Sequence, residues 1–407
     1  MVARENQGAW RRLSRWVETL SKPRVQTLTK ASVWTARGVV WRARMRRWSL
    51  GAQTTLGRLA PALRLPFYAT PLRALLEATR GAEVSETLEY TPRVAARARI
   101  IVNPASGSAS ESSLRELRET ARWLTEHGLP SELRLTKRPG HATDLAREAT
   151  DAGLEMVVAA GGDGTVNDVI QALAGHTTAL GVLPMGTVNV WAREMGISLS
   201  LAEARETLLR GVRRRVDLGR AGQRYFLMMA GIGFDAEVAR RVERGPLKRI
   251  GLKLLDYIAA VVALSVTAKP AELRLQIGER RRRERALMVI IGNTRLYGGA
   301  MTFTQKAVAD DGALDVVVIG SGGLAHRLGV LGRAFLRRPS AGPRVRYLRA
   351  QAIRVESRRA EPVQVDGEVI GNLPMTFSVA PLALRVILPA SAPVELFSLR
   401  PEPWRAR

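Results

Sequence analysis

Apolar and polar positions along the middle of the chain follow a pattern that predicts strands separated by helices. Short apolar runs predict strands at 99–102, 132–136, 154–160 and 179–183, and stretches of helical periodicity predict helices at 111–127, 142–151 and 166–173. Strands and helices that alternate in this way are typical of an α/β domain built on a parallel sheet.

The pattern changes after this region, and strand-like segments dominate the second half of the chain. They are expected at 215–230, 231–234, 272–276, 286–291, 314–319, 352–356, 375–379 and 384–387. Two helices interrupt them, an apolar one at 247–267 and a basic one at 324–336. The apolar stretch at 250–268 contains Lys253 and Asp256, so we expect a buried helix there rather than a membrane span.

Positive charge is concentrated near the N terminus. The 407 residues carry a formal net charge of +26, and residues 1–64 hold fourteen Lys or Arg against two Glu. Trp34, Trp41 and Trp48 recur every seven residues, which puts them on one side of a helix edged by arginines. This arm is expected to bind an anionic membrane surface; packing on the rest of the chain is the alternative, and nucleic acid is a less favoured partner.

Composition excludes several kinds of protein. The chain has no cysteine and four histidines, which excludes disulfides and thiolate metal sites and argues against a multi-histidine zinc centre. No apolar run ending in small residues opens the sequence, so no secretory signal is expected. These features fit a cytoplasmic protein that lies peripherally on the inner face of the membrane.

Three glycine-rich turns follow three of the predicted strands. They are Asn103-Pro-Ala-Ser-Gly107, Gly161-Gly-Asp-Gly-Thr165 and Pro184-Met-Gly-Thr-Val-Asn189. A turn of this kind before a helix presents free backbone N–H groups to an anion, and turns at the ends of neighbouring parallel strands converge on one crevice. Asp163 would repel a phosphate, so its expected role is to act through Mg²⁺. For Thr187 and Asn189 in the third turn, capping of the following helix is the structural alternative to phosphate binding.

With these turns the chain resembles the diacylglycerol kinase catalytic family, which includes bacterial lipid kinases and the sphingosine and ceramide kinases. Further matching runs come in the family's order: Gly231-Ile-Gly-Phe-Asp235, Asn293 with Tyr297-Gly-Gly299, Asp311-Gly-Ala-Leu-Asp315 and Asp366-Gly-Glu368. The resemblance covers residues 99 to about 395 and leaves the N-terminal arm outside.

The resemblance implies an α/β domain and a β-sandwich domain with ATP in the cleft between them. The implied domains are an arm and linker at 1–96, the α/β domain at 97–216 with about 388–400 returning to it, and a lipid-substrate domain at 217–387. It also implies the site residues. For ATP these are Asn103, Pro104, Ser106, Gly107, Thr136, Gly161, Gly162, Asp163, Gly164, Thr165, Asn167, Gly186, Thr187 and Asn189; for a structural Mg²⁺, Asp311 with the main-chain carbonyls of Val308 and Ala313; for catalysis, Glu368 and Asp366.

The chemistry that these residues offer agrees with the resemblance. A lipid hydroxyl needs a carboxylate to take its proton, and we favour Glu368 as the base, with Asp366 orienting it or the metal; a solvated Asp-Gly hairpin turn is the alternative. The expected acceptor is diacylglycerol or a related lipid alcohol. Val190 stands where many relatives that act on diacylglycerol carry a polar residue, which argues against diacylglycerol itself but not against kinase activity. A soluble nucleotide or NAD kinase and a nonenzymatic membrane- or nucleic-acid-binding protein with this fold are the other readings.

Overall fold

The computed structural model describes residues 89–92, 94–104, 110–233, 269–339 and 342–404. The tryptophan-rich arm at 1–64 and the apolar helix expected at 247–267 lie outside these residues. Among the described residues, no helix is long and apolar enough to cross a bilayer.

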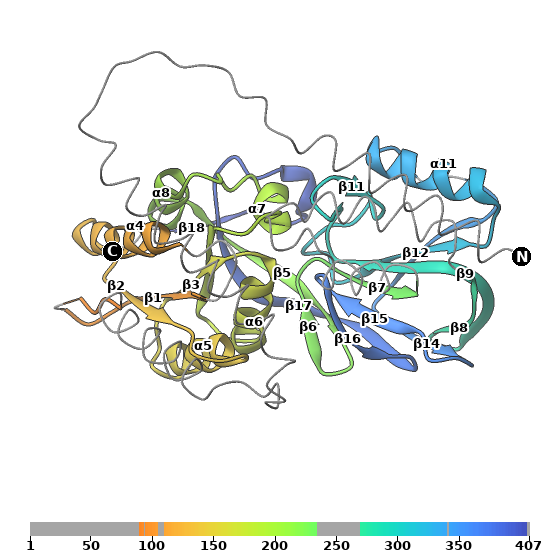
Figure 1. Ribbon diagram of the computed structural model, residues 1–407, viewed down its shortest axis with the longest axis horizontal. Helices are drawn as coiled ribbons and strands as arrows, with labels where there is room; N and C mark the ends of the chain where they lie inside the picture. Colours follow the sequence, from red (N-terminus) through yellow and green to blue (C-terminus); the bar gives the residue numbers. More distant parts are fainter. Residues whose placement is uncertain (1–88, 93, 105–109, 234–268, 340–341, 405–407) are drawn as a thin grey trace, which may run out of the picture. The chain divides into compact units, whose positions relative to one another are not determined.

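The first part of the described chain is an α/β domain on four parallel strands. The strands are β1 (Ala98–Val102), β2 (Ser131–Leu135), β3 (Met156–Gly161) and β4 (Ala179–Pro184), in the order β2-β1-β3-β4. Helices α4 (Glu111–Glu126) and α8 (Leu201–Arg210) cover one face, and α5 (His141–Asp151) and α6 (Asp163–Leu173) cover the other (Figure 1). The short helix α7 (Val190–Glu194) follows β4.

Local sequence explains the bounds of these helices, as α4 illustrates. The Ser110 hydroxyl accepts a hydrogen bond from the Ser113 N–H (3.1 Å) and caps the first turn. The helix buries Leu114, Leu117 and Leu124, whose spacing puts them on one side. It ends before Gly128, whose φ of 93° a residue with a Cβ rarely adopts.

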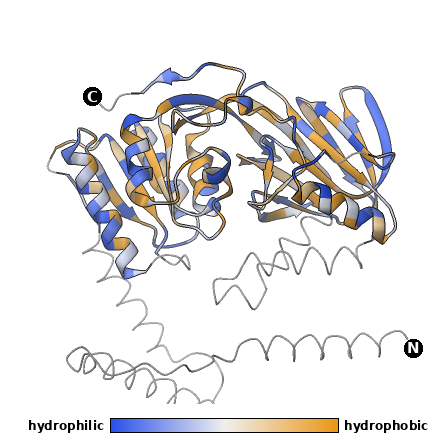
Figure 2. Cartoon of the chain, turned by 90° about the horizontal axis from the view of Figure 1, so that it is seen from above, coloured by the Kyte–Doolittle hydropathy of each residue, from blue (hydrophilic) through white to orange (hydrophobic). Residues whose placement is uncertain are grey.

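The rest of the described chain is a β-sandwich domain with one long helix. Its strands are β5 (Val212–Ala221), β6 (Arg224–Phe226), β7 (Met229–Gly233), β8 (Ala271–Ile277), β9 (Arg280–Gly292), β10 (Leu296–Tyr297), β11 (Met301–Thr302), β12 (Leu314–Gly320), β13 (Val345–Ala350), β14 (Ala352–Ser357), β15 (Pro362–Val365), β16 (Glu368–Asn372) and β17 (Met375–Leu388). Helix α11 (Leu324–Phe335) follows β12. Buried and exposed residues alternate along β8, where Leu273 and Leu275 face the core, and apolar residues concentrate in the strands of both domains (Figure 2).

Three sequence expectations for this half were wrong in their bounds. The strand expected at 215–230 is broken at Gly222, which has a φ of 58°, and separates into β5, β6 and the start of β7. The strands expected at 375–379 and 384–387 are the single strand β17, whose pairing shifts register between Ala380 and Leu384. Strand β9 begins at Arg280, so the run of arginines at its start is part of the sheet.

Strand β17 connects the two domains. Its first part pairs with β14, most of its length pairs antiparallel with β5, and its end pairs in parallel with β4. After β17, a short strand β18 (Glu402–Pro403) returns to pair with β5, and the buried indole of Trp404 donates to the Leu208 carbonyl on α8 (2.8 Å). The hydrogen-bonded ladder is therefore continuous from the parallel sheet into the sandwich.

Candidate active site

Two of the three glycine-rich turns touch each other at the carboxyl ends of β3 and β4. The last pair of the two strands is Gly161 with Pro184, and Met185 donates its N–H to the Gly161 carbonyl (3.0 Å). A Cβ on Gly186 would lie 2.5 Å from the Gly162 Cα, so only glycines permit this approach. The turns meet as the sequence predicts.

The other described residues that were expected to bind the nucleotide lie at the same edge of the sheet. Asn103 and Pro104 follow β1 directly, while Ser106 and Gly107 lie outside the described residues. The Thr136 N–H donates to the Val102 carbonyl (2.9 Å) at the end of the neighbouring strand. Gly162 is the residue before α6, and Gly164, Thr165 and Asn167 belong to the helix itself.

Asp163 has a role that the sequence analysis did not anticipate. Its carboxylate accepts hydrogen bonds from the Val190 N–H (3.0 Å) and the Trp191 N–H (3.2 Å), so it caps the N terminus of α7. Burial raises the pKa of Asp163, against the effect of these two donors. The start of α7 therefore gives this carboxylate a role that needs no metal, while its action through Mg²⁺ stays a prediction.

The Asn189 side chain is also occupied within the protein. Its amide oxygen accepts from the Gly186 N–H (2.8 Å) and its amide nitrogen donates to the Gly186 carbonyl (2.7 Å). These bonds hold the turn, and Asn189 itself has a φ of 51°. The Arg193 side chain donates to the Val188 carbonyl (2.7 Å), so it too is occupied within the turn. Thr187 is the exposed residue of this turn.

Asp366 and Gly367 form the turn of the hairpin β15–β16. Both have positive φ, 47° and 93°, as a two-residue type I′ turn requires. The Asp366 carboxylate is not solvated like an ordinary turn residue: it accepts hydrogen bonds from the N–H groups of Leu227 (2.8 Å), Met228 (2.9 Å) and Met229 (3.0 Å) and from the amide of Asn167 (2.9 Å). Burial raises the pKa of Asp366, and the four donors oppose that rise.

Glu368 is exposed and connects to Asp366 only through other side chains. The Arg224 guanidinium donates to Glu368 (2.8 Å), to Asp168 (3.1 Å) and to the amide oxygen of Asn167 (3.1 Å). The chain of hydrogen bonds Asp366–Asn167–Arg224–Glu368 therefore links α6 of the α/β domain to the hairpin of the sandwich. Within the described part of the chain, the two carboxylates do not share a hydrogen-bond partner, and Asp366 can orient Glu368 only through Asn167 and Arg224.

Arg224 is a site residue that the sequence analysis missed. It lies on β6, inside the segment that was expected to be one uninterrupted strand. The sequence Ala-Gly-Gln at 221–223 is the signal that could have revealed a hairpin there and a short strand after it.

The carboxylates in the loop expected to hold Mg²⁺ contact backbone N–H groups and an arginine. The Asp311 carboxylate accepts from the Ala313 N–H (3.1 Å) and pairs with Arg349. Asp217, which sequence reasoning also missed, accepts from the N–H groups of Gly312 (2.6 Å) and Leu382 (2.7 Å). A single carboxylate between two buried apolar residues in Val-Asp-Leu at 216–218 was the available signal.

Negative charge accumulates around this loop. Burial and the charges of Asp311 and Asp310 together raise the pKa of Asp217. Burial also raises the pKa of Asp315, and Asp311 adds to that effect. The described residues contain no group of three acidic, histidine or cysteine side chains that converge on a metal. One carboxylate with main-chain carbonyls offers the oxygen ligands that Mg²⁺ prefers, and here the Asp311 carboxylate pairs with Arg349.

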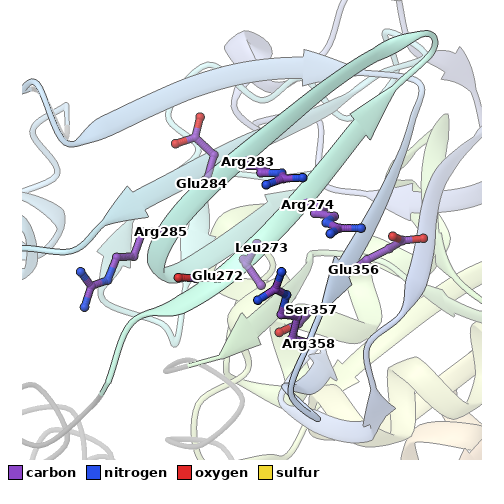
Figure 3. Close-up of a pocket in the computed structure, with 9 residues that line it drawn as sticks. All are labelled: Glu272, Leu273, Arg274, Arg283, Glu284, Arg285, Glu356, Ser357 and Arg358. Carbon is purple, nitrogen blue, oxygen red and sulfur yellow. The ribbon is translucent and has the colours of Figure 1, made fainter.

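A cavity of about 420 Å³ lies elsewhere, on the sheet of the sandwich domain (Figure 3). Its lining comes from β8, the start of β9 and the end of β14 with the residue after it, and includes Arg274, Arg283, Arg285 and Arg358 together with Glu272 and Glu356. None of the predicted site residues lines it. The candidate active site is therefore defined by the contacts among α6, α7, β6 and the β15–β16 hairpin.

Comparisons with known proteins match both domains. Residues 97–221 match the family model described as diacylglycerol kinase catalytic domain, and residues 228–388 match the YegS C-terminal NAD kinase beta sandwich-like domain. A diacylglycerol kinase of Staphylococcus saprophyticus is 30% identical over 283 residues, which are 69% of this chain and 92% of the relative. A probable YegS-like lipid kinase of Chromohalobacter salexigens is 32% identical over 266 residues, 64% of this chain and 85% of the relative.

Solved structures give the same fold. The crystal structure of a putative diacylglycerol kinase from Bacillus anthracis superposes with a TM-score of 0.62 at 23% identity, covering 73% of this chain and 98% of that one. The α/β domain followed by a β-sandwich, expected from the motifs, is confirmed.

Proposed function

Because the chain belongs to the diacylglycerol kinase catalytic family of lipid kinases, we propose that it transfers the γ-phosphoryl group of ATP to the hydroxyl of diacylglycerol or a related lipid alcohol at a membrane surface. The observation that carries the proposal is the chain of hydrogen bonds from Asp366 through Asn167 and Arg224 to Glu368. It supports an arrangement in which an exposed carboxylate of the sandwich is held beside the helix that begins at the glycine-rich turn.

In the proposed reaction Glu368 takes the proton of the lipid hydroxyl. The oxygen then attacks the γ-phosphorus, the bond to the bridging oxygen breaks, and ADP leaves. Glu368 is suited to this role because its carboxylate is exposed and can reach a lipid hydroxyl. The Asp366 carboxylate is buried and already accepts four hydrogen bonds from groups of the protein. Asp366 positions the hairpin and, through Asn167 and Arg224, the base.

The turns at Asn103–Gly107, Gly161–Thr165 and Gly186–Asn189 are the proposed nucleotide site. ATP use is expected of a member of this kinase family. The contact between Gly162 and Gly186 supports the site, since it brings the two turns together beside the start of α6, where backbone N–H groups can bind phosphate. Thr136 and Thr187 are the side chains proposed to border the nucleotide.

Asp311, with the carbonyls of Val308 and Ala313, is the proposed ligand set for Mg²⁺. The bound ion would supply positive charge to a loop crowded by Asp217, Asp310 and Asp315. Burial raises the pKa of Asp217, and the nearby charges of Asp311 and Asp310 add to that rise, so a cation in this loop would be favourable. The residues of the chain hold the loop in place: Gly312 and Leu382 both donate to Asp217.

Residues 1–64 are proposed to hold the enzyme at an anionic leaflet on the cytoplasmic side. Their net charge is +12, from fourteen basic and two acidic residues. Basic residues near such a surface are worth about 1 kcal/mol each, so engagement of half the excess charge would give roughly 6 kcal/mol, enough for reversible recruitment.

The test is transfer of radiolabelled γ-phosphate from Mg-ATP to a total lipid extract and to detergent-dispersed diacylglycerol. Wild-type protein should produce a labelled lipid, and separation of the products identifies the acceptor. Glu368→Gln should lower turnover at least about a hundredfold with ATP binding retained.

Two results would count against the proposal. Turnover close to wild type in Glu368→Gln would remove Glu368 as the base. Labelling of a soluble nucleotide, with no labelled lipid, would favour a soluble kinase instead.

A further inference from the structure

Helix α11 exposes an apolar face instead of burying it. The exposed fractions of its large apolar residues are 48% for Leu324, 46% for Leu328 and 61% for Phe335, and the next residue, Leu336, is 65% exposed. These four are half of the eight large hydrophobic residues that are exposed in the described part of the chain. They lie together on α11 and the residue after it, and a cluster of exposed apolar side chains, unlike single ones, indicates an interaction surface.

The residues between them complete an uncharged strip. At 100° per residue, Leu324, Leu328 and Phe335 fall within about 40° of one another on the helix. Ala325, Gly329 and Gly332 extend the same exposed side, and the opposite side buries Val330 and Ala334 in the core. The outer side of α11 is therefore apolar over its full length, with no charge in its middle.

Arginines border the strip. Arg333 is exposed on one side of it, and Arg337 and Arg338 are exposed directly after the helix. No Asp or Glu occurs between Asp315 and Glu356, whereas eight arginines do. An apolar strip edged by arginines, in a region without acidic residues, is complementary to an anionic lipid surface, where apolar side chains enter the headgroup region and guanidinium groups reach phosphates.

The charge also argues against other occupants. A second copy of this face would bring the same arginines together, and residues 1–64 carry a net charge of +12 that the arginines would repel. A nucleic acid would pair with the arginines but would leave Leu328 and Phe335 in water.

The helix lies close to the candidate active site. It packs against β11, and the turn between β10 and β11 contains Gly299, where a Cβ would lie 2.6 Å from Cγ1 of Val188. Val188 follows Thr187 in the turn proposed to border the nucleotide. Strand β11 and the turn before it therefore connect helix α11 to that turn.

We propose that the outer face of α11, defined by Leu324, Leu328, Phe335 and Leu336, is the surface through which the enzyme enters the headgroup region of an anionic bilayer. This inference rests on the proposed action at a membrane surface. It assigns to the sandwich domain a contact of its own, in addition to the N-terminal arm.

The absence of cysteine from the chain gives a direct test. Phe335→Cys in the full chain is labelled with a polarity-sensitive fluorophore and mixed with vesicles of phosphatidylglycerol and phosphatidylcholine that contain no diacylglycerol, in the absence of ATP. Fluorescence should increase and shift to the blue. The matched control is Leu199→Cys, also exposed (43%) but before α8 in the other domain, and its label should not respond.

A second measurement uses Leu328→Gln with Phe335→Gln in the unlabelled chain. Two apolar side chains no longer enter the bilayer, so affinity for the same vesicles should fall at least about tenfold. Leu199→Gln should leave it unchanged. Activity on detergent-dispersed diacylglycerol should be preserved, because neither residue touches the site.

Three results would overturn the proposal. One is that the label at 335 does not respond although the protein sediments with the vesicles. Another is that the label is already blue-shifted without vesicles, which would mean that protein covers the face. The third is that the double variant binds the vesicles as tightly as wild type. Each is obtained without phosphoryl transfer, so it is distinct from failure of the kinase assignment.

Discussion

Asn167→Asp tests the hydrogen-bonded connection between the two domains with a change of almost no volume. Asn167 donates to the Asp366 carboxylate (2.9 Å) and accepts from Arg224 (3.1 Å). The substitution keeps the acceptor for Arg224 but replaces the donor with a second carboxylate oxygen facing Asp366. The hydrogen bond is lost, and two like charges come into contact.

The expected cost has two parts. A hydrogen bond to a charged group contributes about 1.5–3 kcal/mol. Repulsion between unit charges at the present 2.9 Å separation amounts to about 6 kcal/mol at an effective dielectric constant of about 20. The pair can escape most of that repulsion by taking up a proton. We therefore expect Asn167→Asp to lower the free energy of unfolding by about 3–6 kcal/mol at neutral pH.

The assay is chemical denaturation at two pH values with a double-mutant cycle. The new pair of carboxyl groups has a raised pKa in the folded state. The variant therefore keeps its stability at low pH and loses it as the pH rises through that pKa, so its difference from wild type in free energy of unfolding should be smaller at pH 5 than at pH 7. Combining Asn167→Asp with Asp366→Asn restores a donor and an acceptor between the two side chains but leaves a backbone N–H of 227–229 without its acceptor, so the double variant should be less unstable than the sum of the single variants and still below wild type. Asn167→Ala controls for the missing amide.

Two outcomes would refute this reasoning. Asn167→Asp could remain within about 1 kcal/mol of wild type, which would mean that the contact contributes little. The exchanged pair could also be as unstable as the sum of its single variants, which would mean that the two side chains do not interact.

Three further predictions concern other buried or bound carboxylates. Burial raises the pKa of Glu194, so the free energy of unfolding of wild type should fall as pH rises from about 4 through the folded pKa. Glu194→Gln lacks this titration, so denaturation curves should show its stability rising relative to wild type over the same pH range. Asp163→Ala removes the acceptor for two N–H groups of α7 and should cost about 1–3 kcal/mol in thermal unfolding; an unchanged midpoint would argue against capping. EDTA should lower the unfolding temperature of wild type but not of Asp311→Asn, and an equal shift in both would remove Asp311 as a Mg²⁺ ligand.

The sequence predicted the fold well where periodicity and glycine turns are clear. Strands β1, β3 and β4 lie where short apolar runs predicted them, and the turns after β3 and β4 contain the glycines that let the two turns meet. The expected fold class, an α/β domain followed by a strand-rich domain, is confirmed. The division of 215–230 was missed because Gly222 is one residue in a mixed segment, and its positive φ becomes evident only in the folded hairpin.

The roles of side chains were harder to predict than their positions. Sequence spacing put Asp366 and Glu368 on one turn, but pairing across that turn sends one carboxylate to the backbone of 227–229 and the other to Arg224. Asp163 looked like a metal-dependent carboxylate because its partner, the start of α7, comes from a different strand–helix connection. Such contacts between segments far apart in sequence have no local signal.

Strand β17 has a consequence for how the protein unfolds. The regions matched by the two family models end at residues 221 and 388, yet the strand that flanks β4 comes from the end of the second region, and β5 of the first region pairs along β17. A fragment cut between the regions would leave β4 with an open edge and β17 without its longest partner. The two domains should therefore melt in one cooperative transition, and neither should be obtainable as an independently folded fragment.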